Sequence, residues 1–266
     1  MSVPYPSPRR TLGRTISMDI KGFIPNSLVE WEGKLSSVVF LPRCNLRCRY
    51  CHAHHLILNP DQVENIPRFQ ILRYLAGQEG WVDGVVVSGG EPTLHGDGLL
   101  ELVRQIRETG PQVMIETNGT RPEWIGRLLD EGLLGAIAMD LKAPLTAADY
   151  RRVTGVDVNV EDIRQSVQLV KESGLPHEFR ITLVPGLVGR DELERMVPDL
   201  AGAAQVALQN FKPGLCLDAE LHQVAPFAPA ELDEFEQILT PLVGRVVVRG
   251  RDNAASSAGE GTRQAN

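Results

Sequence analysis

Short apolar runs alternate with amphipathic helical patterns along most of this chain. Most of the runs are almost continuously apolar, which is typical of parallel strands that are buried on both faces. The runs that predict strands are Ser36–Leu41, Gly84–Ser88, Val113–Thr117, Ala136–Leu141, Phe179–Val184, Val206–Leu208 and Arg245–Val248.

The segments between these runs repeat apolar residues at helical spacing. The helical faces lie within residues 99–106, 124–129, 163–170, 193–200 and 232–239. Thr146 and Asn159 each precede an acidic residue by three positions, which is a helix start signal. Gly110 and Gly174 follow two of the helices, where a left-handed cap is favoured.

Strands that alternate with helices in this way predict right-handed βαβ units. We therefore expect an α/β fold with a parallel sheet, either a partial barrel or an open sheet. Of these we predict a partial (β/α)6 TIM-like barrel. In such folds ligands bind beyond the carboxyl ends of the strands.

The ends of the chain differ from its middle. Residues 1–15 lack apolar periodicity and residues 251–266 are small and polar, so we expect two disordered tails around a single domain, 16–250. No apolar stretch approaches the roughly 18 residues of a membrane span, and the first residues lack the apolar core of a signal peptide. We expect a cytoplasmic protein without membrane contact. The net charge of -7 also argues against a broad nucleic-acid interface.

Three of the four cysteines lie within eight residues, as Cys44, Cys48 and Cys51 in the pattern C-x3-C-x2-C. Thiolates this close together suit an iron–sulfur cluster or zinc. Three cysteines on a four-iron cluster leave one iron open to a substrate, as in catalytic metal sites. Structural zinc, with His52, His54 or His55 as a fourth ligand, is the alternative. Cys216 reads as an unremarkable thiol.

Polar segments follow the first four predicted strands, where a ligand site is expected. The segments are 43–55, 89–93, 118–120 and 142–144. Gly89 and Gly90 let the backbone approach a ligand closely, although two glycines alone usually mark a turn. By themselves, Asn118-Gly119 is an ordinary turn sequence, and Asp140 with Lys142 could be a solvated pair.

Taken together, these motifs resemble the radical S-adenosylmethionine (SAM) enzymes, whose signature is C-x3-C-x-aromatic-C; Tyr50 supplies the aromatic residue. The resemblance implies a [4Fe-4S] cluster on the three cysteines, with SAM bound to the fourth iron and cleaved to a 5′-deoxyadenosyl radical. It places Tyr50 beside the adenine. The GGEP string implies that Gly89, Gly90 and Glu91 bind the amino group of SAM.

Two further strings resemble the activases that install glycyl radicals. In Glu116-Thr117-Asn118-Gly119 and Asp140-Leu141-Lys142, the resemblance implies cofactor-binding positions. Glu116, Thr117 and Asp140 would hold a monovalent cation, with Asn118 beside them and Lys142 at the SAM carboxylate. A group near the SAM ribose would come from Gln209, Asn210 or Lys212, and the sequence does not choose among them.

The resemblance is strongest to the anaerobic ribonucleoside-triphosphate reductase activating proteins. It implies a glycyl-radical protein as substrate and a flavodoxin or ferredoxin-type electron donor. Two other functions stay open. One is radical SAM chemistry on a small molecule or a nucleic acid. The other is a non-enzymatic cluster that transfers electrons or senses oxidants.

Overall fold

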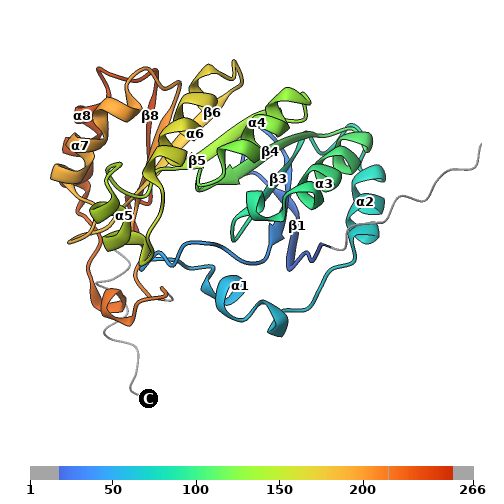
Figure 1. The fold of residues 1–266 in the computed structure, drawn as a ribbon, viewed down its shortest axis with the longest axis horizontal. Coiled ribbons are helices and arrows are strands. Elements are labelled where there is room, and N and C mark those ends of the chain that lie inside the picture. Colours follow the sequence, from blue (N-terminus) through green and yellow to red (C-terminus); the bar gives the residue numbers. More distant parts are fainter. Residues whose placement is uncertain (1–17, 215, 254–266) are drawn as a thin grey trace, which may run out of the picture.

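The computed structural model describes residues 18–214 and 216–253, which are organised around one sheet of eight strands (Figure 1). The strands lie side by side in sequence order. β1 is antiparallel to β2, and each later pair of neighbours is parallel. The strands are β1 (Gly22–Ser27), β2 (Ser36–Leu41), β3 (Gly84–Gly89), β4 (Gln112–Thr117), β5 (Ala136–Asp140), β6 (His177–Leu183), β7 (Val206–Asn210) and β8 (Val246–Arg249).

Helices connect the parallel strands and cover one face of the sheet (Figure 1). The α-helices are α1 (His54–Leu58), α2 (Arg68–Ala76), α3 (Asp97–Glu108), α4 (Pro122–Asp130), α5 (Ala147–Thr154), α6 (Val160–Glu172), α7 (Arg190–Leu200) and α8 (Pro229–Leu239). Three short 3₁₀ helices are η1 (Pro60–Gln62), η2 (Pro92–His95) and η3 (Ala219–Gln223).

The sheet curls toward a barrel without closing. β1 and β8 are its two edges. Arg245, just before β8, pairs with Glu32 in the β1–β2 connection, with 2.8 Å between guanidinium nitrogen and carboxylate oxygen. The two ends of the sheet therefore approach each other. This confirms the α/β partial barrel that the sequence predicted, with β2 to β7 as its six parallel strands and β8 as one more.

Both faces of the sheet bury apolar side chains, which explains the nearly continuous apolar runs. The larger core joins strand residues such as Val85 and Ile115 to helix residues such as Leu99 and Ile106. A separate smaller core consists of Trp31, Val38, Val86, Met114, Ala136 and Ala138. Side chains alternate between the faces of a strand, so the smaller core fills part of the barrel interior.

All seven predicted strands are present, and five of the eight α-helices in residues 18–214 and 216–253 match the predicted faces. The sequence missed β1, because GFIPNS contains Pro25 and lacks alternation. Proline is tolerated there because β1 is an edge strand. The start signal at Thr146 is confirmed, since its Oγ1 accepts a hydrogen bond from the Asp149 N–H at 3.2 Å.

The chain continues beyond β8 in contact with the barrel. Arg251 pairs with Asp233 at 2.5 Å, and Asn253 donates to the Asn210 carbonyl at 2.9 Å. The expected N-terminal tail, residues 1–15, lies outside the described residues. So do residues 254–266 of the expected C-terminal tail. None of the helices in the described part is long and apolar enough to cross a membrane.

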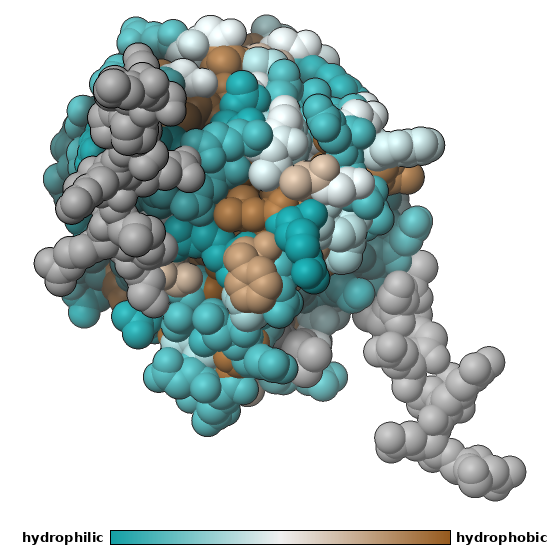
Figure 2. Space-filling view, turned by 90° about the vertical axis from the view of Figure 1, so that its right-hand side faces the viewer, coloured by the Kyte–Doolittle hydropathy of each residue, from teal (hydrophilic) through white to brown (hydrophobic). Residues whose placement is uncertain are grey.

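The side of the molecule shown in Figure 2 is largely hydrophilic, with hydrophobic side chains gathered near its centre. Among the large apolar residues of the described chain, Phe69 of α2 is 63% exposed and Trp81 is 75% exposed. Folded proteins commonly expose such residues singly, so their exposure alone does not define a binding surface.

Candidate active site at the carboxyl ends of the strands

The three clustered cysteines lie in the loop that leaves the carboxyl end of β2. Backbone hydrogen bonds fix this loop on two sides. The N–H groups of Arg47 and Arg49 donate to the carbonyls of Thr154 and Val153, at the end of α5, at 2.8 and 3.1 Å. On the other side, the N–H of Leu217 donates to the Cys51 carbonyl at 3.0 Å. Backbone contacts thus set the path of the cysteine loop.

The two glycines at the end of β3 pack against this loop. A Cβ atom on Gly89 would lie 2.2 Å from the Leu41 carbonyl oxygen, and one on Gly90 would lie 1.8 Å from that of Arg43. The Gly90 N–H donates a hydrogen bond to the Leu41 carbonyl, and the Glu91 N–H donates one to the Arg43 carbonyl, each at 2.8 Å. The sequence suggested close approach to a ligand, and the structure adds a different reason for glycine here, which is contact with the cysteine loop.

Glu91 is buried, with 1% of its surface exposed. Its carboxylate accepts hydrogen bonds from the Thr93 N–H at 3.1 Å, the Thr117 hydroxyl at 2.7 Å and the Asn118 N–H at 2.6 Å. The Thr93 hydroxyl donates a fourth at 2.5 Å. Burial raises the pKa of Glu91, and these donors oppose the rise. Its carboxylate therefore joins the end of β3 to the end of β4.

The residues expected to hold a monovalent cation are paired with protein groups. Glu116 accepts a hydrogen bond from the Ser88 hydroxyl at 2.5 Å and forms an ion pair with Arg180 of β6. Asp140 pairs with Lys142 at 2.8 Å. Thr117, as described above, donates to Glu91. These arrangements do not fit the predicted cation site, because both carboxylates are already paired with basic side chains.

Lys142 places a positive charge beside the cysteines. Burial would lower its pKa, but the nearby Asp140, Tyr50 and Cys48 outweigh burial and raise that pKa well above the usual value. Lys142 is therefore protonated at neutral pH. Its ammonium nitrogen lies 5.9 Å from the centre of the Tyr50 ring.

The hydroxyl of Tyr50 is buried without a hydrogen-bond partner among the described residues. Burial raises the pKa of this phenol, opposed first by Lys142 and more weakly by the Thr182 hydroxyl, which lies beyond normal hydrogen-bond geometry. Buried polar groups are rarely left unpaired. Tyr50 thus offers an unused hydrogen-bonding group at this site.

The cysteines are buried enough to disfavour free thiolates. Burial raises the pKa of Cys48 to about 12, and the charge of Lys142 is the main effect opposing it. Burial, with Glu91 next, raises the pKa of Cys44 to about 11, and burial also raises the pKa of Cys51. Thiolates at these positions therefore need a cationic partner such as iron, with Lys142 in support.

All twelve predicted site residues line one cavity of about 120 Å³ at the carboxyl ends of β2 to β5. They are Cys44, Cys48, Tyr50, Cys51, Gly89, Gly90, Glu91, Glu116, Thr117, Asn118, Asp140 and Lys142. The structure thus brings together residues from four separate motifs. Leu46, Ile57 and Ser88, which the sequence did not single out, complete the lining.

The donor set of this cavity fits an iron–sulfur cluster better than zinc. In the described part of the chain, no three His, Cys, Asp or Glu side chains are placed to bind one common ion. A [4Fe-4S] cluster takes each thiolate on a different iron, so its ligands need not converge. The zinc alternative also loses its fourth ligand. His52 and His54 make contacts with the carbonyls of Lys212 and Cys51, at 2.8 and 3.3 Å. Neither they nor His55, the third candidate, line the cavity.

Three residues, Gln209, Asn210 and Lys212, were candidates for a contact with the SAM ribose, and the structure argues against one of them. The Asn210 side chain donates to the carbonyls of Phe227 and Gly250, at 3.0 and 3.2 Å, so its amide hydrogens are already used by backbone groups.

The fourth cysteine, Cys216, is buried, with its sulfur 3.9 Å from the His52 ring nitrogen, and it does not line the cavity.

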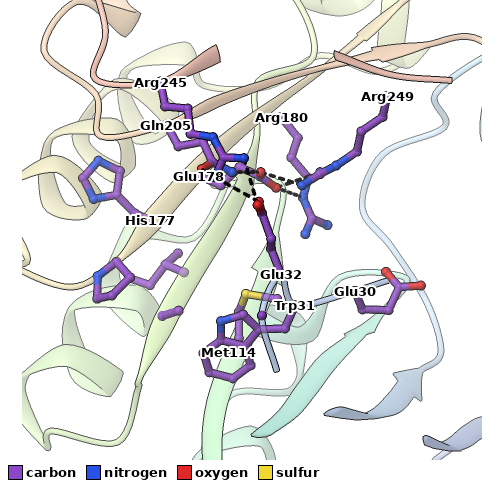
Figure 3. A pocket seen from close by; sticks show the side chains of 14 residues that line it. Glu30, Trp31, Glu32, Met114, His177, Glu178, Arg180, Gln205, Arg245 and Arg249 are labelled. Atoms are coloured by element: carbon purple, nitrogen blue, oxygen red, sulfur yellow. Dashed lines mark hydrogen bonds and ion pairs between the residues drawn. The ribbon is translucent and has the colours of Figure 1, made fainter. Parts of the chain in front are cut away.

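A chain of ion pairs crosses the barrel interior below the cavity. Arg180 bridges Glu116 and Glu178, and Arg249 of β8 binds Glu178 through both guanidinium nitrogens, at 2.9 and 2.7 Å. Glu178 and Arg180 also line a second cavity of about 400 Å³ near the amino ends of the strands (Figure 3). Sequence reasoning missed Arg180. The available signal was a charge within an apolar buried run, which requires a buried partner.

The fold and the site define a class of enzyme. Residues 38–197 match the model of the radical SAM superfamily, and the chain belongs to this superfamily. This chain is therefore a radical SAM enzyme, and the cofactors of that family are a [4Fe-4S] cluster and SAM.

Individual relatives narrow the comparison. A Methanocaldococcus jannaschii protein named as a proposed glycyl-radical enzyme activating enzyme is 30% identical over 237 residues, or 86% of this chain and 95% of that one. The pyruvate formate-lyase-activating enzyme of Streptococcus mutans is 29% identical over 58% of this chain and 61% of its own. The 7-carboxy-7-deazaguanine synthase of Hyperthermus butylicus is 27% identical over 72% of this chain and 87% of its own.

Among solved structures, Streptococcus suis SuiB bound to the precursor peptide SuiA superposes with a TM-score of 0.61 at 16% identity. The match covers 81% of this chain and 49% of SuiB, so this chain spans about half of that protein. At this identity the similarity supports the fold alone.

Proposed function

We propose that this enzyme installs a glycyl radical on a protein substrate, and that the substrate is an anaerobic ribonucleotide reductase or a related glycyl-radical enzyme. Sequence relatedness supports the activase role, because the similarity to the M. jannaschii protein extends over 95% of that protein. The choice of the reductase rests on the motif resemblance described above. A flavodoxin or ferredoxin would supply the electron.

The residues of the cofactor cavity have distinct roles in this proposal. Cys44, Cys48 and Cys51 bind three irons of the cluster. The backbone at Gly89 and Gly90 binds the amino group of SAM, and Lys142 binds its carboxylate. When bound, the cluster and SAM supply the 5′-deoxyadenosyl radical. The buried Tyr50 hydroxyl, which lines the same cavity, is available to hydrogen bond with the nucleoside part of SAM.

The observation that carries the choice of a protein substrate is the ion-pair chain across the barrel. Glu116 lines the cofactor cavity, Glu178 lines the cavity beneath it, and Arg180 bonds to both carboxylates. The paired side chains separate the two spaces along this line. A substrate would therefore approach SAM from the strand ends, where a loop of a large protein can present a glycine.

Chemistry on a small molecule is the second candidate, and one observation favours it. The interior cavity of about 400 Å³ has room for a compact organic molecule, and Trp31 and Met114 give it an apolar side opposite its arginines (Figure 3). Such a substrate would reach SAM only after Arg180 moves. A relative that makes a small molecule, the deazaguanine synthase, keeps this candidate in view.

The test is an anaerobic reaction with purified components. The enzyme is reconstituted with iron and sulfide, reduced with dithionite, and mixed with SAM and a purified anaerobic ribonucleotide reductase. We expect 5′-deoxyadenosine together with the electron paramagnetic resonance (EPR) doublet of a glycyl radical. Cys48→Ala should abolish both products, whereas the matched Cys216→Ala variant should retain them because Cys216 does not line the cavity.

The two products separate the outcomes. Formation of 5′-deoxyadenosine without a glycyl radical, on this reductase and on other glycyl-radical enzymes, would reject the activase role and leave the radical SAM chemistry standing. Retained SAM cleavage in Cys48→Ala would reject the proposed cluster ligands.

A further inference from the structure

We propose that Asn118 is a positioning residue for the cluster. Its side-chain amide donates a hydrogen bond to the sulfur of Cys44 and raises the reduction potential of the cluster. The Asn118 Nδ2 lies 3.7 Å from the Cys44 Sγ, within the range of an N–H···S hydrogen bond. The Leu46 N–H is a second donor to the same sulfur at 3.4 Å. Of these two donors Asn118 is the one that uses its side chain, so its hydrogen bond to the sulfur can be removed by substitution.

The orientation of the Asn118 amide follows from its neighbours. Its Oδ1 accepts from the Thr120 N–H at 3.0 Å and from the Thr120 hydroxyl at 2.7 Å. The Thr120 oxygen in turn accepts from the Asn45 Nδ2 at 2.8 Å. This leaves the Asn45 Oδ1 to accept from the Asn118 Nδ2 at 3.0 Å. A flipped Asn118 amide would set its NH₂ against the Thr120 N–H, so the ring of bonds directs Nδ2 toward Cys44.

The backbone of Asn118 is held as firmly as its side chain. Its N–H donates to the Glu91 Oε2 at 2.6 Å, and Glu91 is itself fixed by Thr93 and Thr117. Asn118 is 4% exposed and Glu91 is 1% exposed. Water therefore does not compete for these bonds, and the position of the donor is set by buried contacts. This gives Glu91 an indirect part, in which it holds Asn118 in place.

The expected effect on the cluster follows from charge. One-electron reduction adds a negative charge to the cluster, and that charge is shared with the sulfur ligands. A donor N–H on such a sulfur stabilises the reduced form more than the oxidised form and raises the potential. A buried hydrogen bond is stronger than an exposed one because the local dielectric is low. The inference rests on the cluster alone and is independent of the protein substrate.

Asn118→Ala removes the donor, and Asn210→Ala is the matched control. Asn210 is also a buried asparagine at a strand end, with bonds to backbone groups, but it does not line the cofactor cavity. Both variants are reconstituted without SAM and titrated anaerobically with redox mediators, and the EPR signal of the reduced cluster is followed.

We expect Asn118→Ala to shift the reduction equilibrium roughly tenfold toward the oxidised form, about 59 mV more negative for a one-electron couple. Asn210→Ala should keep the wild-type potential. An unchanged potential in Asn118→Ala with a full [4Fe-4S] spectrum would overturn the proposal. An equal shift in both variants would also overturn it, because the effect would then be general destabilisation.

A second measurement needs no variant, should Asn118→Ala fail to take up the cluster. Wild-type protein is labelled with ¹⁵N at asparagine side chains, reconstituted and reduced, and examined by pulsed EPR. We expect a ¹⁵N coupling to the cluster spin from the labelled amide. Its absence would refute the hydrogen bond to Cys44. Either result is obtained without SAM and without a protein substrate, so failure here and failure of the activase role are distinguishable.

Discussion

Replacing Gly90 with alanine tests how the cysteine loop is held. The added Cβ would lie 1.8 Å from the Arg43 carbonyl oxygen, whereas contacts under 3.0 Å are essentially never seen. The two backbone segments must therefore move apart by at least 3.0 − 1.8 = 1.2 Å. Because Arg43 directly precedes Cys44, the movement displaces a proposed cluster ligand. It also breaks the 2.8 Å hydrogen bond from the Glu91 N–H to the Arg43 carbonyl.

The cost of this change can be estimated from two contributions. Overpacking a well-packed site costs about 1–3 kcal/mol. Loss of one buried backbone hydrogen bond adds about 1 kcal/mol. We therefore expect Gly90→Ala to reduce the free energy of unfolding by about 2–4 kcal/mol, which most folded domains of this size survive. The barrel should still fold while the cysteine loop is displaced.

Two assays report the two effects. Urea unfolding of the metal-free protein gives the stability, and iron and sulfide analysis after anaerobic reconstitution gives the cluster content. Gly126→Ala is the matched control, since its Cβ would meet nothing within 4 Å and alanine is favoured over glycine in a helix such as α4. A Gly90→Ala protein with wild-type stability and full cluster content would refute the packing argument.

Four further substitutions test the charged groups of the cofactor site and of the barrel interior. Lys142→Met should weaken SAM binding roughly 10- to 100-fold in an anaerobic titration, through loss of a charge-assisted bond; unchanged affinity would remove Lys142 from the SAM site. Arg180→Met should cost about 3–5 kcal/mol in urea unfolding, because it leaves buried carboxylates unpaired. Arg245→Met breaks an exposed ion pair and should cost about 0–1 kcal/mol. If both arginine variants lost the same free energy of unfolding, the role of the buried ion pairs would be contradicted. Burial alone would raise the pKa of Glu178, but Arg249 and Arg180 lower it below the usual 4.5. Glu178 therefore stabilises the fold above its unfolded pKa and loses that contribution as the pH falls through its lowered pKa. Between about pH 6 and pH 3, urea unfolding should show a smaller stability loss for Glu178→Gln than for wild type, and parallel losses would contradict this.

The motif resemblance supplied the individual site residues, and the strand pattern predicted that they would lie together, because parallel strands bring their carboxyl ends to one edge of the sheet. The sequence was less informative about what each side chain does. Glu91 was expected to bind SAM, and the structure adds that its carboxylate accepts four hydrogen bonds from protein groups. Such partners come from residues more than twenty positions away as well as from neighbours, so local motif reading does not reveal them.

The same limit applies to the barrel interior. Phe179–Val184 was predicted as a strand from its apolar residues, and β6 is present, but the partners of Arg180 depend on strand order and register. Asp140 and Arg180 are directly opposite each other in the sheet, whereas Glu116, the ion-pair partner, lies two strands away from Arg180. β1 was missed for a local reason, because its proline and exposed residues remove the pattern that predicts a strand.

The backbone contacts of the cysteine loop bear on how this enzyme withstands air. Carbonyls of Leu41, Arg43 and Cys51 are held by N–H groups from other segments, and no cysteine sulfur takes part in those bonds. The loop is therefore shaped when the polypeptide folds, rather than when iron and sulfide arrive. A molecule whose cluster is destroyed by oxygen would keep its ligands in place. Its repair then requires reduction of the thiols and new iron and sulfide, without another round of folding.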